Sequence, residues 1–464
     1  MRSLAVGFSS AMLLALLLTP QVRRLAIRLG ALDRYSARKV LGGSTVPRLG
    51  GLAIAVAFYV TWLLLWFGQS TLAVGAVTAW PPLAALLLGG LPILLLGCVD
   101  DLRGMRALTK LTVQVTVSVL LWYAGLRISG PVLGWDLPRW LSLLLTVLWI
   151  TGVINAVNLI DGLDGLASGV ALFALSSTAV IAMLRGELVL ALLVVTLAGA
   201  VAGFLVFNWN PASIIMGDAG SMFLGYLLAT TSIWTVQKSA TIVLAVLPAV
   251  TLGLPLLDTS LTIGRRLLSG RPVMLADRDH VHHRLLGRGL SHRQAVMLLY
   301  AVCAVFSGLS IGMVLSGPVL SKLLLLLAAL FAGGLAYALG YVGRGPEGVW
   351  EGLRRRRRNR AILRRLSSLG HQLQGAQQVA DLQQAVREFA QALGTVDLTL
   401  VLDGSEAADR SETGTSYPIR TLDGVVARLE LNVDERHISP DDRVLMQLLC
   451  DMLAPPLCRL SRRR

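Results

Sequence analysis

Apolar runs of bilayer length are the feature that most limits how this chain can fold. A transmembrane helix needs about 20 consecutive apolar residues, and about eleven runs approach that length. They lie near 2–20, 50–67, 82–99, 107–125, 138–157, 164–184, 187–207, 219–236, 240–262, 294–315 and 318–342. With 55% hydrophobic and only 15% charged residues, the chain does not have the composition of a soluble domain. The sequence therefore predicts an all-α polytopic membrane protein, with residues 1–343 as its membrane domain.

The basic residues predict the orientation of these helices. Lys and Arg gather in the loops at 22–48, 100–110 and 263–293, whereas the intervening loops carry almost no charge. Positively charged loops stay on the cytoplasmic side, so we expect the N-terminus outside and the C-terminal region in the cytoplasm. The net charge of +15 is then explained by topology and anionic headgroups. We expect membrane lipid, and no nucleic acid, among the partners.

The polar clusters all fall on the predicted cytoplasmic side, and the richest of them runs from Asn155 to Gly169. Residues three apart share one face of a helix, so we expect one polar stripe. Its members are Asn155, Asn158, Asp161 and Asp164. Helix capping alone would explain one such residue per helix end, and this stretch has four.

Three further carboxylates follow or precede apolar runs. Asp100 and Asp101 end one run, and Asp218 lies between two glycines where another begins. The simpler alternatives are salt bridges to nearby cations for the pair, and dipole capping for Asp218. Together with Asn158, Asp161 and Asp164, however, they form a set of oxygen ligands without cysteine. Such ligands suit Mg²⁺, or alternatively Mn²⁺.

A basic cluster in the 263–293 loop favours an anion. Its members are Arg278, His280, His282, His283 and Arg284. Cationic surroundings disfavour zinc and favour phosphate, although headgroup binding without catalysis is an alternative. Carboxylates for a hard cation and basic groups for phosphates on one membrane face indicate phosphoryl transfer from a soluble donor to a lipid acceptor. The main alternative is a membrane transporter, which would place its ionisable groups nearer the bilayer midplane.

Five motifs in order resemble the polyprenyl-phosphate N-acetylhexosamine-1-phosphate transferases, the glycosyltransferase 4 family, over about residues 1–340. They are Pro47-Arg-Leu-Gly-Gly51, Val99-Asp-Asp-Leu-Arg103 with Lys110 and Gln114, Asn155 to Gly169, Asn208-Trp-Asn-Pro with Met216-Gly-Asp-Ala-Gly-Ser221, and Ala276-Asp-Arg-Asp-His-Val-His-His-Arg-Leu285. The resemblance implies a UDP-N-acetylhexosamine donor, undecaprenyl phosphate as acceptor, Mg²⁺ dependence and release of UMP. It also implies the bacterial inner membrane, and it is compatible with a homodimer.

The resemblance assigns roles to matching positions. Asp218 and Asn158 match the metal positions, and Asp100, Asp101 and Asp218 match catalytic ones, with an Asp acting either as nucleophile or as base. The substrate-binding positions are Lys110, Asn155, Asp161, Asp164, Asn208, Arg278, His280, His282, His283 and Arg284. The Asp-Arg-x-His-x-His-His-Arg pattern is similar to the branch that uses simple sugars such as UDP-GlcNAc. The muramoyl-pentapeptide branch, the alternative, carries a three-histidine run followed by Phe-Glu. Asp279 stands where the first branch has Gly, which leaves the sugar open.

The composition changes after residue 343. Residues 344–365 are Arg-rich and read as a juxtamembrane segment at an anionic surface. The pattern of residues 366–464 predicts that they form a small cytoplasmic α+β region. We expect a helix over 366–393, strands over 396–402 and 424–431, and a helix from Pro440. This order resembles a GAF-like sensory domain, but it carries no ligand motif.

Overall fold

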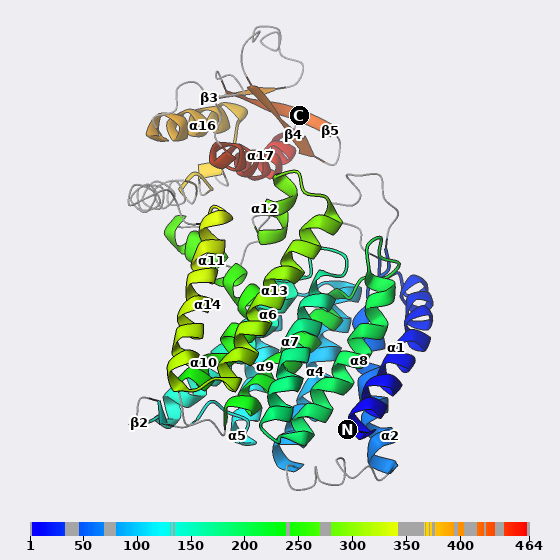
Figure 1. Ribbon diagram of the computed structural model, residues 1–464. Helices are drawn as coiled ribbons and strands as arrows, with labels where there is room; N and C mark the ends of the chain where they lie inside the picture. Colours follow the sequence, from blue (N-terminus) through cyan, green and yellow to red (C-terminus); the bar gives the residue numbers. More distant parts are fainter. Residues whose placement is uncertain are drawn as a thin grey trace. The chain divides into compact units, whose positions relative to one another are not determined.

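The computed structural model describes most of the chain. The described residues are 2–32, 46–68, 80–129, 131–132, 135–237, 242–269, 280–341, 366, 368–370, 372–373, 376–393, 398–402, 415–421, 424–431 and 440–461. The chain divides into two compact units (Figure 1). Unit 1 comprises 1–265 and 273–343, and unit 2 comprises 266–272 and 344–464. The Arg-rich segment predicted at 344–365 lies outside the described residues.

Unit 1 is built from helices and one small hairpin. The helices are α1 (Arg2–Arg28), α2 (Gly50–Phe67), α4 (Trp80–Arg103), α5 (Ala107–Tyr123), α6 (Arg139–Ile160), α7 (Leu166–Leu184), α8 (Leu188–Asn208), α9 (Gly217–Gln237), α10 (Ile242–Thr251), α11 (Gly253–Ser269), α12 (Val281–Gly287), α13 (His292–Leu315) and α14 (Pro318–Ala338). Strands β1 (Pro131–Val132) and β2 (Trp135–Asp136) pair antiparallel.

Within the described ranges, eight helices are long and apolar enough to cross a membrane: α1, α2, α4, α6, α7, α8, α13 and α14. This confirms the prediction of a multi-pass helical membrane protein, while the count of eleven spans stays a prediction. The single helix predicted over 240–262 is wrong, because α10 ends at Thr251 and α11 begins at Gly253. Pro255 has no N–H to donate to the carbonyl of Thr251, so one helical hydrogen bond is lost here, which favours the break.

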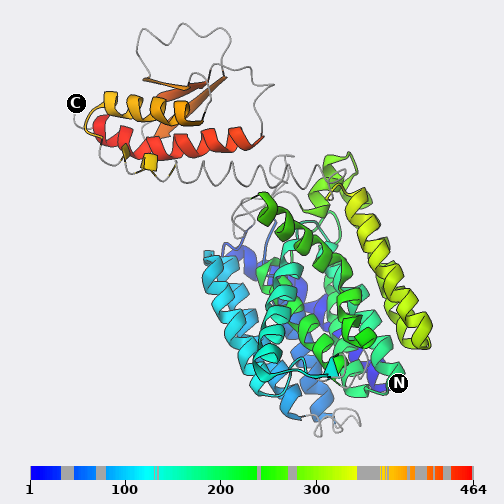
Figure 2. The same ribbon diagram turned by 90° about the vertical axis from the view of Figure 1, so that its left-hand side faces the viewer.

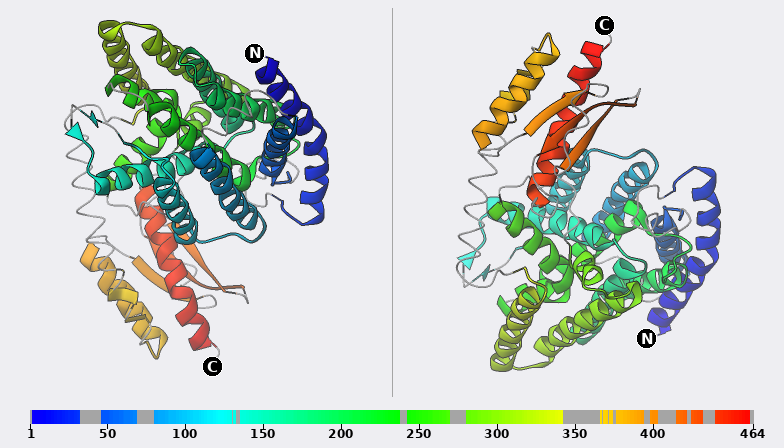
Figure 3. Two further views of the ribbon diagram at one scale, coloured as in Figure 1. Left: turned by 90° about the horizontal axis from the view of Figure 1, so that it is seen from below. Right: turned by 90° about the horizontal axis from the view of Figure 1, so that it is seen from above.

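Helix α9 is central in unit 1, where it packs against α2, α4, α6, α7, α8 and α10. Two glycines allow its N-terminal end to approach its neighbours closely. A Cβ on Gly51 of α2 would collide with the backbone of Gly220, and one on Gly97 of α4 would collide with the backbone of Ala219. The end-on views show α1 and α14 on different sides of the bundle (Figure 3). The predicted site motifs before α2, at the end of α4 and at the start of α9 are therefore packed against one another.

Unit 2 has a three-stranded antiparallel sheet in the order β3-β5-β4, from β3 (Leu398–Leu402), β4 (Thr415–Thr421) and β5 (Gly424–Leu431). Helices α16 (Val379–Leu393) and α17 (Pro440–Ser461) pack on the sheet (Figure 2). Leu400 of β3 pairs with Leu429 of β5, and both are buried in the core of this unit. The sequence did not predict β4, since Pro418 lies inside it and proline argues against a strand.

The helix predicted over 366–393 is also interrupted in unit 2. Residues 376–378 are not helical, and α16 begins at Val379. The Asp381 carboxylate accepts hydrogen bonds from the backbone N–H groups of Gln377 and Gln378, at 2.8 Å each. A carboxylate in the first turn stabilises a helix start through such bonds, which explains the break in a stretch of otherwise helical composition.

Candidate active site

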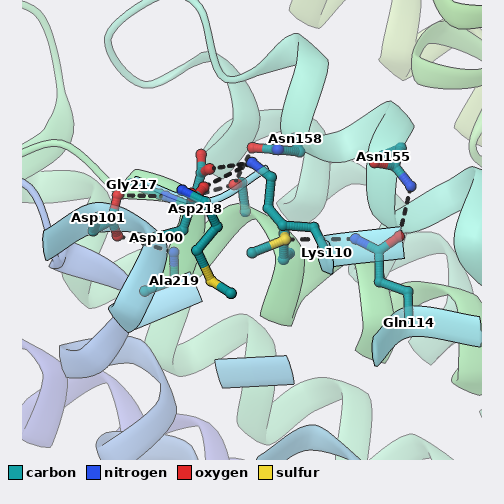
Figure 4. A network of polar contacts seen from close by, with 12 residues as sticks. Asp100, Asp101, Lys110, Gln114, Asn155, Asn158, Gly217, Asp218 and Ala219 are labelled. Atoms are coloured by element: carbon teal, nitrogen blue, oxygen red, sulfur yellow. Dashed lines mark hydrogen bonds and ion pairs between the residues drawn. The ribbon is translucent and has the colours of Figure 1, made fainter. Parts of the chain in front are cut away.

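The Lys110 ammonium joins two of the predicted carboxylates. Lys110 lies in the first turn of α5, and its Nζ contacts Asp100 Oδ2 at 2.7 Å and Asp218 Oδ2 at 3.0 Å (Figure 4). Asp100 lies near the end of α4, and Asp218 in the first turn of α9. The side chains of Lys110 and Asp218 are 21% and 29% exposed, so a ligand from solution can reach this ion pair. Three predicted site residues from three helices therefore meet at one accessible point.

Asp101 has a different environment from its neighbour Asp100. Its two carboxylate oxygens accept hydrogen bonds from the backbone N–H groups of Asp218 and Ala219, each at 3.0 Å. These N–H groups belong to the first turn of α9, and N–H groups in a first turn have no hydrogen-bond partners within their own helix. Asp101 thus caps α9 from another helix, and Gly217, at φ +74°, leaves room for its carboxylate.

Asn158 also contacts the first turn of α9. Its Oδ1 accepts a hydrogen bond from Ser221 Oγ at 2.8 Å, and the same hydroxyl lies 3.0 Å from the carbonyl of Gly217. Asn158 lies near the C-terminal end of α6. The structure therefore brings Asn158 to the start of α9 beside Asp218, as its predicted role as a partner of Asp218 requires.

The predicted stripe of four polar residues is wrong as a single helix face. Helix α6 ends at Ile160, so only Asn155 and Asn158 of the four lie on it. Gly165, at φ +77°, helps to turn the chain before α7 begins at Leu166. Asn155 Nδ2 donates to Gln114 Oε1 at 2.7 Å, which links α6 to α5 one turn from Lys110 (Figure 4).

Asp164 and Asn208 hold the turn after α6 against the end of α8. Asp164 Oδ2 accepts from Asn210 Nδ2 at 3.0 Å and from the N–H of Ala212 at 3.1 Å. Asn208, only 2% exposed, accepts from the N–H of Gly165 and from Ser168 Oγ, and it donates to the carbonyl of Ile214. Through these contacts, both residues stabilise the packing of the turn after α6 against the end of α8. Their substrate-binding roles stay predictions, as does that of the partly exposed Asp161.

The histidine cluster is packed against the same turn. A Cβ on Gly162 would collide with the ring of His282, so these two residues are in close contact. His282 is buried; its ring is parallel to that of His280, with centroids 5.9 Å apart, and tilted by 43° against that of His283, with centroids 4.4 Å apart. Burial, and then the neighbouring His283, lower the pKa of His282 to about 3, so its ring is neutral at physiological pH. Arg278, predicted to belong to this cluster, lies outside the described residues.

Arg284 points from α12 to the end of α14. It lies over the Tyr341 ring, 4.0 Å from the centroid, and its Nη1 donates to the carbonyls of Leu339 and Gly340 at 3.1 Å each. These contacts fix α12, and the predicted role of Arg284 toward a substrate stays a prediction.

Asp258 of α11 is a buried residue that the sequence reading did not single out. It contacts His280, the N–H of Val281 and the hydroxyl of Tyr341. A signal was present, because a carboxylate inside the apolar run 240–262 is costly unless it has partners.

The oxygen atoms of Asp218 and Asn158 are suitable ligands for a hard cation. Asp218 carries a carboxylate and Asn158 an amide oxygen, and both lie at the first turn of α9. Among the described residues, no group of three or more His, Cys, Asp or Glu is arranged to hold a metal ion. Mg²⁺ commonly takes only one or two protein ligands and completes its shell with water and substrate phosphates. The residues present are therefore compatible with Mg²⁺ bound jointly with a phosphorylated substrate.

Together, these features define a polytopic membrane protein with charged groups gathered at the ends of its helices. Comparison with known proteins identifies the family. The pattern of the family described as "Glycosyl transferase family 4" matches residues 83–236, from the first turn of α4 to the last turn of α9. The chain belongs to glycosyl transferase family 4.

Relatives named as sugar-phosphate transferases support this membership. The chain is 39% identical over 308 residues to a probable undecaprenyl-phosphate N-acetylglucosaminyl 1-phosphate transferase of Bacillus subtilis, covering 66% of this chain and 83% of the relative. It is 36% identical to a decaprenyl-phosphate N-acetylglucosaminephosphotransferase of Mycolicibacterium smegmatis, and the match covers 65% of this chain and 79% of the relative. A phospho-N-acetylmuramoyl-pentapeptide-transferase of Shouchella clausii is 31% identical, and the match covers 66% of this chain and 96% of the relative.

Proposed function

We propose that the protein transfers N-acetylglucosamine 1-phosphate from a UDP-sugar to undecaprenyl phosphate, which starts a lipid-linked envelope polysaccharide. An oxygen of the lipid phosphate forms a bond to the phosphorus that carries the sugar. The bond between that phosphorus and the bridging oxygen of the diphosphate breaks, and UMP leaves with this oxygen. The products are UMP and a lipid-linked sugar diphosphate.

The observation that carries this proposal is the ion pair of Lys110 with Asp100 and Asp218. The two carboxylates outweigh the charge of the ammonium, so the group favours a bound divalent cation that brings phosphate oxygens to it, and the Lys110 ammonium can donate to those oxygens. Placing charged groups where charge develops is the main contribution of a protein to phosphoryl transfer. A transporter has no such requirement, and the names of the relatives also favour an enzyme.

We further propose that Mg²⁺ is the metal, held by Asp218 and Asn158 together with the donor diphosphate. A bound divalent cation would neutralise charge on the phosphates. The residues of this chain have separate tasks: Lys110 binds phosphate, Asp101 holds the start of α9, and Asn158 is oriented by Ser221.

N-Acetylglucosamine is favoured over muramoyl-pentapeptide as the sugar part of the donor. The N-acetylglucosaminyl relative is 39% identical, whereas the muramoyl-pentapeptide relative is 31% identical. The His-x-His-His-Arg pattern at 280–284 supports the same branch.

The proposed orientation puts this site on the cytoplasmic side of the bacterial inner membrane, where a water-soluble nucleotide sugar is available. The basic loops support it, since they lie next to the site motifs in sequence. The N-terminus would be outside and unit 2 in the cytoplasm. The likeness of unit 2 to a GAF domain and the homodimer remain predictions.

The test is direct. Purified protein in detergent, given UDP-GlcNAc, undecaprenyl phosphate and Mg²⁺, should release UMP and form the lipid-linked product. Asp218→Asn should lower kcat by at least about 100-fold, since it removes the carboxylate proposed to hold Mg²⁺. Glu187→Gln, at the other end of α7 and α8, is the matched control and should retain activity. A wild-type protein that forms no UMP with any UDP-sugar would overturn the proposal.

A further inference from the structure

Asp258 is a buried carboxylate, and the proposed reaction gives it no task. It lies in α11 and is 1% exposed. Its Oδ2 contacts His280 Nδ1 at 2.9 Å. Its Oδ1 accepts from the N–H of Val281 at 2.9 Å and from the Tyr341 hydroxyl at 3.0 Å. Both oxygens are therefore occupied, as a carboxylate removed from water requires.

These partners fix which nitrogen of His280 carries a proton. An ionised carboxylate can only accept hydrogen bonds, so Nδ1 of His280 must be the donor. The other ring nitrogen, Nε2, makes no hydrogen bond with the part of the chain that the structure describes. The hydrogen bond at one ring nitrogen sets the state and direction of the other. His280, which is 4% exposed, is therefore held with a lone pair on Nε2 that can accept a hydrogen bond.

His280 is also placed rigidly with respect to the proposed site. It is the N-cap residue of α12, but its side chain makes no capping bond there. Its ring is parallel to that of His282, at an interplanar angle of 5°, and His282 contacts Gly162 in the turn after α6. The His280 ring is therefore linked through His282 to the turn that follows α6 and contains Asp161.

We propose that Asp258 is a positioning residue, which holds the His280 ring so that Nε2 accepts a hydrogen bond from a hydroxyl group of the nucleotide-sugar donor. This inference rests on the proposed function and extends it to a residue outside the five motifs. Asp258 itself does not touch the donor. Its effect passes through His280 alone, and its bonds to Val281 and Tyr341 only hold the carboxylate in place.

A purely structural role predicts a different pattern, and a double-mutant cycle separates the two. Asp258→Asn presents an amide N–H₂ or a neutral oxygen to Nδ1, which weakens or reverses the tautomer preference. We expect kcat/KM to fall by at least about tenfold in Asp258→Asn, the scale found when a carboxylate that orients a histidine is removed. His280→Ala should fall by a similar or larger factor. The double variant should be no worse than His280→Ala, because the two residues act as one unit.

Tyr341→Phe is the matched control. It removes one hydrogen bond from the same carboxylate and leaves the bond to His280 intact. Activity within about twofold of wild type is expected, with any cost appearing in thermal stability only. A Tyr341→Phe loss equal to that of Asp258→Asn would show that Asp258 is a structural anchor, and would overturn the inference. Additive losses in the cycle would do the same.

A second variant keeps the inference testable if Asp258→Asn does not fold. In His280→Asn, the side-chain N–H₂ takes the place of Nδ1–H and retains the bond to Asp258, but no group replaces Nε2. We expect it to be as inactive as His280→Ala and to melt near the wild-type temperature. Recovery of activity in His280→Asn would overturn the inference. A wild-type protein that is active while the cycle is additive rejects the inference alone, whereas an inactive wild-type protein rejects the proposed function.

Discussion

The Asp101 carboxylate caps the helix that carries Asp218, because its Oδ1 accepts the backbone N–H of Asp218 at 3.0 Å. The adjacent Asp100 instead contacts Lys110 at 2.7 Å. Two neighbouring acids in the sequence therefore have separate tasks. Asp101 sets the position of α9, and Asp100 belongs to the charged group that a ligand meets.

This division predicts opposite patterns in two matched variants. Asp101→Asn removes the charge at the start of α9 and replaces one acceptor oxygen by N–H₂, which faces a backbone N–H. We expect the melting temperature to fall, in line with a loss of about 1 kcal/mol or more for a helix cap. Asp100→Asn should leave the melting temperature nearly unchanged, since its remaining oxygen can still accept from the N–H of Met105 and Lys110 retains Asp218, while UMP release falls by at least about tenfold.

Thermal unfolding and UMP release, measured on both variants in the same detergent, check this prediction. Equal melting temperatures for the two variants would contradict the assignment of Asp101 as the cap of α9. Normal turnover in Asp100→Asn would remove Asp100 from the reacting group.

Gly162 predicts a second effect, because any side chain there collides with the His282 ring. Gly162→Ala should push the histidines from the turn after α6 and lower kcat/KM by about tenfold, with most of the change in KM for the UDP-sugar. Gly152→Ala is the matched control, since no atom lies within 4 Å of a Cβ at this helical position. It should retain activity and gain up to about 1 kcal/mol of stability. Equal KM values for the two variants would contradict the contact.

Particular residues show why much of this arrangement could be predicted from sequence. Apolar run length gave the helices, because a bilayer leaves few other ways to bury them. The acids at the ends of those runs gave the candidate site: Lys110, Asp100 and Asp218 do meet, and Asn158 does reach the start of α9. Charge next to an apolar segment is costly, so its position in the sequence is informative.

Other features depended on tertiary contacts that no local pattern specifies. The partners of Asp101 are backbone N–H groups more than a hundred residues away. Asn208 was predicted to bind substrate, yet its side chain is buried and accepts hydrogen bonds from Gly165 and Ser168. The sequence did not predict a role for Asp258, which lies inside an apolar run, because its three partners lie at the start of α12 and just after α14, far from it in the sequence. Strand β4 was missed since its pairing with β5 outweighs the poor strand propensity of its Pro418.

Metal dependence follows from the oxygen ligands at the start of α9. We expect UMP release to stop in excess chelator and to return with Mg²⁺ or Mn²⁺, since carboxylate and amide oxygens suit hard cations. Binding of a UDP-sugar, measured by isothermal titration with and without Mg²⁺, gives an independent readout, and Asp218→Asn should abolish the difference. Full turnover in excess chelator would rule out a metal requirement.

The buried His282 predicts how stability depends on pH. Burial lowers its folded-state pKa to about 3, whereas the pKa of an unfolded histidine is near its usual 6.5. Between these values the unfolded chain binds a proton that the folded chain does not. The free energy of unfolding therefore falls as the pH drops below 6.5, by up to about 1.4 kcal/mol per pH unit for this one group. Above 6.5 both states are neutral, and the contribution of His282 is constant.

His282→Gln isolates this effect, because glutamine retains a polar side chain that does not titrate. We expect the wild-type melting temperature to fall more than that of His282→Gln between about pH 7.5 and about pH 5.5, and the two proteins to respond alike above that range. Other titrating groups are common to both proteins and cancel in the difference. Equal slopes below pH 6.5 would mean that His282 takes up its proton in the folded protein, which requires a polar or charged partner for its ring.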